Sequence, residues 1–271
     1  MTTSTDAFVQ HRNLLFTVAY EMLGSAADAE DVLQETWLRW ADVDHGEVRD
    51  ARSSLVRITT RLSLNRLRTL GRQRETYVGP WLPEPLLTSP DVAEDVELAD
   101  SVSTAMLLVL ETLTPTERAV FVLREVFDVE YDEIAAAVDK APAAVRQIAH
   151  RARSHVEARR PRVQVSEADT RRAIATFRSA AETGDLQRLL DVLAPDVVMM
   201  TDGGGVKQAA LRPILGADKV LRFFVGITAK APGPVAAEEV LVNGAPGLRL
   251  TAGGELDTIA EEVARRHATA Y

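Results

Sequence analysis

Arginine side chains recur along one stretch of this sequence at a spacing that would place them on a single face of a helix. The stretch LVRITTRLSLNRLRTLGRQR covers residues 55–74. Its polar stripe, at steps of four, four, three and four, consists of Arg57, Arg61, Asn65, Arg68 and Arg72. Residues at these steps share one side of an α-helix, and guanidinium groups bind phosphate through paired hydrogen bonds. The stripe therefore predicts a polyanion-binding surface, where Asn65 can both donate to and accept from a base edge.

A second basic group lies in the stretch PAAVRQIAHRARSHVEARR, residues 142–160. A short helical segment and a tight break precede it, and this layout is typical of a helix-turn-helix, whose second helix enters the major groove. The predicted buried face of that helix consists of Val145, Ile148, Ala149, Ala152 and Val156. The candidates for contacts with DNA are Arg146, Gln147, His150, Arg151 and Arg153. An ordinary surface role remains the alternative for His150.

Charge is distributed unevenly along the chain, although its formal net charge is −9. Residues 57–75 hold six arginines and one acid, and residues 141–163 hold six arginines and one acid. Between them, residues 83–112 hold seven acids and no basic residue. The net charge argues against a protein that coats DNA generically. The uneven distribution instead predicts two polyanion-binding modules with an acidic connector, for which simple solvation is the alternative reading.

The segments around these basic groups have the periodicity and the caps of helices. An apolar pattern predicts a first helix ending at Gly24, and Ser25 with Asp28 predicts the start of a second. That second helix carries an acidic stripe opposite its apolar side, with the members Asp28, Asp31, Gln34 and Glu35. Ser53 and Ser54 are the predicted caps of the arginine-rich helix. Thr114 to Glu117 predicts a capping box ahead of the helix-turn-helix.

Length and composition limit the classes of protein to which the chain can belong. Its 271 residues are enough for two or three domains. The sequence has no cysteine, no membrane-spanning apolar run and no signal-peptide pattern, so we expect a cytoplasmic protein without disulfides and without membrane contact. We find no catalytic acid–base pair and no metal-ligand cluster, and we therefore expect neither an enzyme nor a cofactor.

The C-terminal part has a different pattern from the helical first half. Predicted helices over residues 166–182 and 217–228 alternate with a strand at VVMMT and a glycine turn at DGGG. The stretch EEVLVNGAPGLRLT reads as one strand interrupted by Asn-Gly and Pro-Gly. Helices combined with antiparallel strands predict an α+β domain. The proline-rich stretch YVGPWLPEPL, residues 77–86, predicts a stiff spacer with an apolar anchor.

Three separated blocks of the sequence resemble the extracytoplasmic-function sigma factors. The blocks are DAEDVLQETWLRW, LNRLRTLGRQRE and LTPTERAVFVLREVFDVEYDEIAAAVDKAPAAVRQIAHRAR. The resemblance implies a region 2 helical bundle at 1–76, a linker at 77–100 and a region 4 helix-turn-helix at 101–161. It also implies a monomer that binds core RNA polymerase and promoter DNA.

The resemblance also implies roles for individual residues. The residues that would contact the clamp of the β′ subunit are Asp28, Asp31, Gln34, Glu35 and Trp37. The arginine-striped helix would recognise and melt the −10 element, while the second helix of region 4 would read the −35 element. Region 4 would also meet the β flap of polymerase.

YVGPWLPEPL and TDGGGVKQAALRPILGADKVLRFF resemble two signatures of the sigma-factor group with a C-terminal SnoaL-like domain. The resemblance implies a cone-shaped helix-and-sheet domain at 164–271 that regulates the sigma domains. The implied interdomain residues are Trp81, Leu82, Pro83, Glu84, Pro85, Asp202, Gly203, Gly204, Gly205 and Lys207. We expect Trp81 and Leu82 to be buried near residues 202–207. Val206 separates Lys207 from the glycines, which is a departure from the commoner form.

Two other functions remain open on the sequence. A helix-turn-helix repressor or activator with a ligand-binding domain would explain the second basic group, but not the arginine stripe ahead of it. A SnoaL-like enzyme fused to a DNA-binding segment would explain the third domain, but the domain lacks an acid–base pair.

Overall fold

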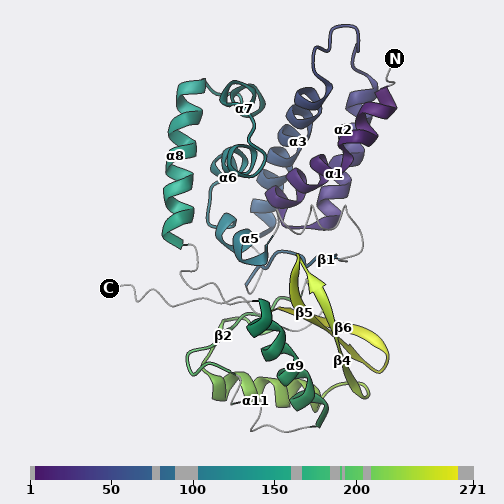
Figure 1. Ribbon diagram of the computed structural model, residues 1–271, viewed down its shortest axis with the longest axis vertical. Helices are drawn as coiled ribbons and strands as arrows, with labels where there is room; N and C mark the ends of the chain where they lie inside the picture. The colour runs from purple at the N-terminus through teal and green to yellow at the C-terminus, as the bar shows by residue number, and fades with distance from the viewer. Residues whose placement is uncertain are drawn as a thin grey trace. The chain divides into compact units, whose positions relative to one another are not determined.

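The computed structural model describes residues 4–74, 80–88, 103–159, 167–183, 190, 193–203 and 209–261. The chain forms two compact units. One unit joins residues 1–76 to 92–160, and the other joins residues 77–91 to 161–271. Figure 1 shows that helices make up the described part of the first unit, whereas the second combines helices with an antiparallel sheet.

The first unit begins with three helices packed against one another: α1 (Ser4–Leu23), α2 (Ala26–Ala41) and α3 (Ala51–Arg74). The predicted boundary at Gly24 is confirmed, because this residue takes a φ of 71° that favours glycine. The predicted cap of α2 is also confirmed, since the Ser25 hydroxyl accepts a hydrogen bond from the Asp28 amide. Trp40 lies fully inside the bundle.

The start of α3 differs from the sequence prediction. Its cap is Asp50, whose carboxylate accepts hydrogen bonds from the backbone amides of Arg52 and Ser53. The Ser53 hydroxyl donates to the same carboxylate, and this bond lowers the pKa of Asp50. The prediction that Ser53 and Ser54 cap the helix was wrong, because Asp50 offers two acceptor oxygens three residues earlier.

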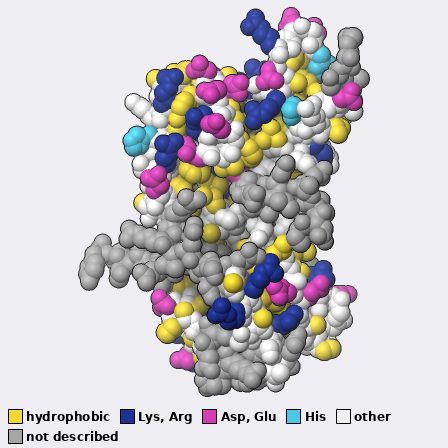
Figure 2. Space-filling view, viewed as in Figure 1, with side chains coloured by type: hydrophobic (Ala, Val, Ile, Leu, Met, Phe, Trp, Pro, Cys, Tyr) yellow, Lys and Arg dark blue, Asp and Glu magenta, His cyan; other side chains and the backbone are white. Residues whose placement is uncertain are grey.

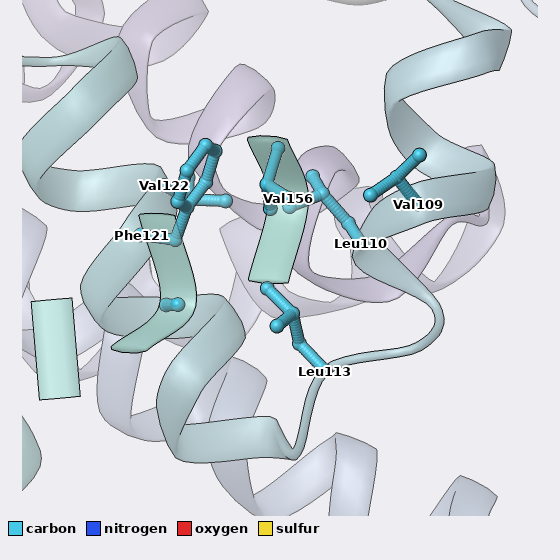
Figure 3. Close-up of a cluster of buried hydrophobic side chains, with 7 residues drawn as sticks. Val109, Leu110, Leu113, Phe121, Val122 and Val156 are labelled. Carbon is cyan, nitrogen blue, oxygen red and sulfur yellow. The ribbon is translucent and has the colours of Figure 1, made fainter. Parts of the chain in front are cut away.

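The remaining helices of the first unit are α5 (Thr104–Leu110), α6 (Pro115–Phe121), α7 (Tyr131–Val138) and α8 (Pro142–Arg159), with a π-helical turn, η1 (Val122–Val126), after α6. The predicted capping box between Thr114 and Glu117 is present at the start of α6. One apolar cluster joins α5, α6, η1 and α8 (Figure 3), and it contains Val109, Leu110, Leu113, Phe121, Val122, Ala152 and Val156.

Helices α7 and α8 form the predicted helix-turn-helix. Asp139, with a left-handed φ of 55°, ends α7, and Pro142 opens α8 after a tight break. The buried face of α8 is the predicted one, with the members Val145, Ile148, Ala149, Ala152 and Val156. This face fixes the rotation of α8 about its axis and turns the polar residues of the helix outward.

The second unit is an α+β domain that incorporates part of the predicted linker. Its described helices are α9 (Glu167–Thr183) and α11 (Ala217–Thr228), and its described strands are β1 (Leu87–Thr88), β2 (Val198–Met199), β3 (Ile214–Leu215), β4 (Val235–Val242), β5 (Ala245–Ala252) and β6 (Glu255–Glu261). An antiparallel sheet runs in the order β1-β4-β5-β6, and α9 packs against β4 and β5. A second pairing joins β2 to β3.

The stretch EEVLVNGAPGLRLT is a hairpin, so the single-strand prediction was wrong. Asn243 and Gly244 take φ values of 48° and 77°, and Val242 pairs with Ala245 across this turn. Two successive positive φ values are the geometry of the tight hairpin turn that Asn-Gly favours. Pro246 and Gly247 lie within β5, where Gly247 gives room for the Val242 side chain.

Among the described helices, none has the length and apolar character needed to cross a membrane.

Candidate nucleic-acid interface

The arginine stripe of α3 is a solvent-facing row. Its members Arg57, Arg61, Asn65 and Arg68 are exposed, while Leu55 and Leu62 on the opposite face are buried. Arg72 belongs to the same helix, but its side chain lies outside the described part. The buried face therefore determines the direction of the stripe, as the sequence pattern predicted.

Polar contacts within α3 restrain the C-terminal half of this stripe. A guanidinium nitrogen of Arg68 donates to the Asn65 Oδ1 atom over 3.0 Å. This bond takes one of the two lone pairs of the amide oxygen, and the amide nitrogen of Asn65 keeps its two protons for other acceptors.

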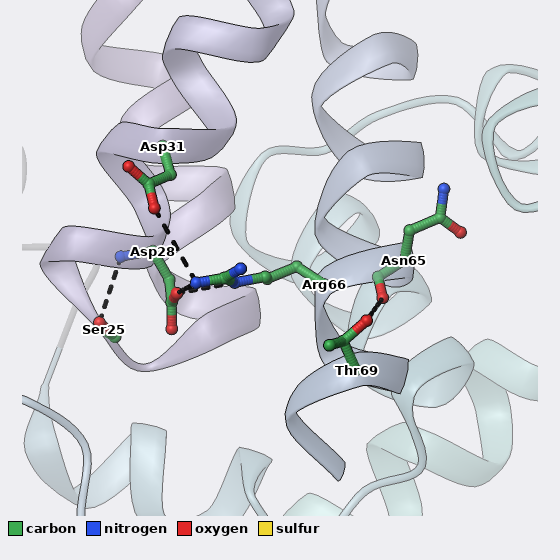
Figure 4. A network of polar contacts seen from close by, with 6 residues as sticks. All are labelled: Ser25, Asp28, Asp31, Asn65, Arg66 and Thr69. Carbon is green, nitrogen blue, oxygen red and sulfur yellow. Dashed lines mark hydrogen bonds and ion pairs between the residues drawn. The ribbon is translucent and has the colours of Figure 1, made fainter. Parts of the chain in front are cut away.

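The acidic stripe of α2 divides into one structural residue, Asp28, and several exposed ones; Figure 4 shows Asp28 and Asp31 beside Arg66 of α3. Asp28 accepts two hydrogen bonds from the Arg66 guanidinium, and its side chain is only 13% exposed. Asp31 lies 3.9 Å from the same guanidinium and is largely exposed, and Gln34 is also exposed. Arg66 lies off the stripe that the spacing identified, and it joins α3 to α2.

The rest of the α2 surface is a mixed polar and apolar patch. Glu35 is exposed and pairs with Arg39 at 2.7 Å, while the ring centroid of Trp37 lies 5.2 Å from that of Phe8. Leu38 is 64% exposed beside these residues. Leu38 was not predicted as part of this surface, because its position one residue after Trp37 follows neither the apolar nor the acidic periodicity.

The second basic row lies on α8 and is likewise exposed. Its members Arg146, Gln147, His150, Arg151 and Arg153 all face solvent. Arg153 makes a bidentate contact with Glu125 of η1, with one N–O distance of 3.0 Å. The guanidinium carbon of Arg146 lies 5.6 Å from the centre of the Tyr131 ring, which also receives Arg124 at 4.9 Å. Tyr131 therefore orients Arg146, a role that the sequence pattern did not reveal.

Basic and acidic side chains lie beside one another over the helical unit on the face drawn in Figure 2. Several arginines on this unit are paired within the protein, as the 2.7 Å contact between Arg12 and Glu30 illustrates. Some arginines of the basic segments, among them Arg66 and Arg153, are therefore already engaged by carboxylates of the protein.

A buried polar contact joins α6 to α1. Arg118 of α6 is 2% exposed, donates its Nε to the backbone oxygen of Glu21 over 2.7 Å, and pairs with Glu111 at 2.6 Å. The carboxyl group of Glu21 is 1% exposed and accepts no hydrogen bond from the described residues. Burial raises the pKa of Glu21 to about 8, although the charge of Arg118 lowers it. Neither Glu21 nor Arg118 was predicted as a functional residue, since neither follows the polar periodicity of the two basic rows or of the acidic stripe.

The predicted linker residues contact the C-terminal domain. The backbone amide of Leu82 donates to Asp202 Oδ2 over 2.8 Å. Leu86 makes two hydrogen bonds with Asn243. The backbone amide of Leu86 donates to Asn243 Oδ1 over 3.1 Å, and the backbone amide of Asn243 donates to the Leu86 carbonyl oxygen over 2.8 Å. Pro83 is buried, Trp81 and Leu82 are half-buried, and Glu84 and Pro85 are exposed. Gly203 lies in a described, half-buried position beside Asp202, whereas Gly204, Gly205 and Lys207 lie outside the described residues.

Comparison with known proteins identifies the family of the chain. Residues 7–73 match sigma-70 region 2, and residues 103–156 match sigma-70 region 4. The chain is 38% identical over 249 residues to the ECF RNA polymerase sigma factor SigJ of Mycobacterium tuberculosis. The alignment covers 89% of this chain and 78% of SigJ. The chain belongs to the extracytoplasmic-function sigma factors.

A second relative and a solved structure of SigJ agree with that assignment. A probable ECF RNA polymerase sigma factor, SigI of Mycobacterium tuberculosis, is 35% identical over 79% of this chain and 73% of its own length. The crystal structure of SigJ matches the present structure with a TM-score of 0.71 at 33% identity, over 94% of this chain and 90% of that one. The predicted architecture, two all-α sigma domains followed by a SnoaL-like α+β domain, is confirmed.

The family assignment decides between the functions that the sequence left open. This sigma factor binds core RNA polymerase and promoter DNA and directs transcription initiation, and it is not an enzyme. The helix-turn-helix is region 4 of a sigma factor, so the repressor and fused-enzyme alternatives are wrong.

Proposed function

We propose that this sigma factor contacts promoter DNA through the two exposed basic rows described above. The −10 element would meet the α3 row, whose members are Arg57, Arg61, Asn65, Arg68 and Arg72. The −35 element would meet the α8 row, whose members are Arg146, Gln147, His150, Arg151 and Arg153. The observation that carries the proposal is the presence of two basic helix faces in one chain, each backed by a buried apolar face. Guanidinium groups so presented can bind phosphates and base edges.

We assign polymerase contact to the exposed side of α2, facing the clamp of the β′ subunit. Asp31, Gln34 and Glu35 supply its polar part, and Trp37 with Leu38 supplies an apolar part. Asp28 stabilises the position of α2 rather than contacting polymerase, because its carboxylate accepts a hydrogen bond from Arg66 of α3.

Region 4 would meet the β flap. Since core polymerase and promoters are found together in the cytoplasm, the protein would act there, as a monomer when free.

We also propose that the C-terminal domain regulates transcription by capturing the linker between regions 2 and 4. The hydrogen bond from Leu82 to Asp202 and the pair between Leu86 and Asn243 hold the linker at both ends of residues 82–86. The next residues form β1, which pairs with Val242 and Leu241 of β4. A captured linker restricts how far regions 2 and 4 can separate, so capture would restrain promoter engagement.

Loss of these bonds should release the linker. We expect the variant Asp202→Ala/Asn243→Gly to raise the hydrogen-exchange rates of both linker amides. The rise should be about tenfold or more at Leu82, because a hydrogen bond to a charged carboxylate contributes about 1.5–3 kcal/mol. It should be smaller at Leu86, whose bond to the neutral Asn243 amide contributes about 0.5–1.5 kcal/mol. Glycine at position 243 preserves the positive φ of the turn, so the hairpin remains intact. The same variant should also give a higher yield of run-off transcript, because the C-terminal domain no longer holds the linker and so no longer limits the separation of regions 2 and 4.

The matched control is Asp218→Ala, which removes an exposed carboxylate from α11 of the same domain. This change should leave both exchange and transcript yield as in the wild type. Faster exchange in the double variant without any change in transcript yield would show that the linker is only a spacer.

A further inference from the structure

The Arg146 side chain contacts an aromatic ring rather than a carboxylate at the surface of the helix-turn-helix. Arg146 lies in the second turn of α8, and its guanidinium carbon is 5.6 Å from the centre of the Tyr131 ring at the start of α7. Tyr131 is half-buried, whereas Arg146 is exposed. Arg146 makes no side-chain hydrogen bond or ion pair with the residues that the structure describes. The ring is therefore the feature of the described protein that orients this arginine.

Two neighbouring arginines are engaged by carboxylates instead. Arg153 makes a bidentate contact with Glu125, and Arg124 pairs with Asp128 at 2.9 Å. The N–H donors that face these carboxylates are occupied. An aromatic face, in contrast, attracts a guanidinium group without supplying an acceptor atom. Arg146 is therefore oriented while its N–H donors remain available to a ligand.

Arg124 holds the Tyr131 ring in place. The guanidinium carbon of Arg124 lies 4.9 Å from the centre of that ring, and the Arg124 side chain is only 24% exposed. One of its nitrogens also donates to the backbone oxygen of Val129 over 3.1 Å. Because the carboxylate of Asp128 offsets the charge of Arg124, two cations can contact one ring with less mutual repulsion. Tyr131 thus offers Arg146 a surface whose position is fixed.

The place of Arg146 on α8 suits contact with a base. In a helix-turn-helix, residues near the N-terminus of the second helix reach the base edges in the major groove. A guanidinium fork with available donors matches the paired acceptors O6 and N7 of guanine, whereas adenine presents one acceptor and one donor there. A fork held in one orientation penalises the wrong base more than a mobile fork does, because a mobile one can turn to another acceptor.

We propose that Tyr131 is a positioning residue that fixes Arg146 for bidentate recognition of one guanine in the −35 element. Arg146 contacts the base, and Tyr131 acts through Arg146. This inference rests on the proposed role of the α8 row, and it adds the base that is selected and the side chain that makes the selection strict.

Selection of DNA by the reconstituted holoenzyme tests the proposal. The probe is the promoter that the wild-type holoenzyme selects from random DNA, with its −35 element randomised again. The full-length variants are Tyr131→Phe, Tyr131→Leu, Arg146→Ala and the double variant Tyr131→Leu/Arg146→Ala, each bound to core polymerase. Phenylalanine keeps the aromatic face, whereas leucine is apolar and has none. Sequencing the bound and the input DNA gives the preference for guanine at each position.

The wild type should prefer guanine at one −35 position by about 5- to 150-fold, and Arg146→Ala should abolish the preference at that position alone. Tyr131→Phe should retain the preference. Tyr131→Leu should lower it about two- to fivefold at the same position, because the cation–π contact is lost, and should leave the other positions unchanged. In the Arg146→Ala background, Tyr131→Leu should have no further effect, since the side chain that it positions is gone.

The possible results separate the positioning role from the proposed function. If Arg146→Ala leaves the preference at every −35 position unchanged, the proposed contact between Arg146 and a base is wrong. If Arg146→Ala abolishes a guanine preference that Tyr131→Leu leaves intact, Arg146 reads the base without Tyr131 and the positioning role is wrong. An equal loss at all positions, or a loss of the same size in the Arg146→Ala background, would show that Tyr131 only stabilises region 4. Dependence of another base on Arg146 would overturn the assignment to guanine.

Discussion

Replacement of Arg146 or Arg151 by alanine is expected to weaken binding to the −35 element by about 1–3 kcal/mol, which corresponds to a loss of about 5- to 150-fold. Both side chains are exposed on α8, and Arg146 is already oriented by the ring of Tyr131. A positioned guanidinium loses little further freedom when it meets a base edge, so its removal should be costly. The measurement is the affinity of polymerase holoenzyme for promoter DNA, compared at several salt concentrations.

The salt series distinguishes a contact with a base from a contact with a phosphate. Loss of a phosphate contact should weaken binding to all sequences and lower the salt slope by about one, whereas loss of a base contact should relax selectivity at one promoter position. The matched control is Arg159→Ala, in the last turn of the same helix. Promoter selectivity and affinity that are unchanged in both Arg146→Ala and Arg151→Ala would show that another face of α8 meets the DNA.

Replacement of Glu21 by methionine is expected to stabilise the protein strongly at alkaline pH. The folded state raises the pKa of this buried carboxyl from 4.5 to about 8, so the folded protein keeps a proton that the unfolded chain releases. Stability therefore decreases as the pH rises from 4.5 to 8, by about 5 kcal/mol at most, and levels off above pH 8. Methionine has a similar length and no charge, so Glu21→Met should lose this dependence.

Urea unfolding followed by tryptophan fluorescence at pH 5 and pH 8.5 measures this effect. The variant should be several kcal/mol more stable than the wild type at pH 8.5, with a smaller gain at pH 5. The exposed acid Glu47 provides the control, because Glu47→Gln should leave the difference between the two pH values unchanged. The burial of an uncharged Glu21 would be contradicted if the wild-type protein unfolded at the same urea concentration, or at a higher one, at pH 8.5 as at pH 5.

Helical periodicity was sufficient to predict the two basic rows. Leu55 and Leu62 on α3, like Val145 and Ile148 on α8, are buried where the pattern placed them. The polar rows on the opposite faces follow from this burial, because the rotation of a helix about its axis is determined by its apolar side. Local capping was predictable for the same reason at Thr114, where all the interacting groups lie within four residues.

Contacts between distant segments could not be predicted from the sequence. Arg118 and Glu21 are 97 residues apart, and Leu86 and Asn243 are 157 residues apart. Asn243 has the local sequence signal of a turn. Its second role, as a hydrogen-bond partner of Leu86 in the linker, depends on how the fold brings these two distant segments together. Likewise, the spacing identified Asp28 as a surface residue, whereas Arg66 of the neighbouring helix holds it in place. In each case the partner is determined by the packing of elements, which a local pattern does not contain.

If the α3 and α8 rows direct core RNA polymerase to a promoter, transcription must depend on both of them. Run-off transcription with purified core polymerase measures this dependence, on a promoter selected by sequencing DNA bound to the reconstituted holoenzyme. We expect a discrete transcript that requires this protein and that disappears when Arg57, Arg68, Arg146 and Arg151 are all replaced by alanine, while binding to core polymerase is retained. A transcript that persists in the fourfold variant, or the absence of any promoter-dependent transcript with the wild type, would show that the two rows do not direct initiation.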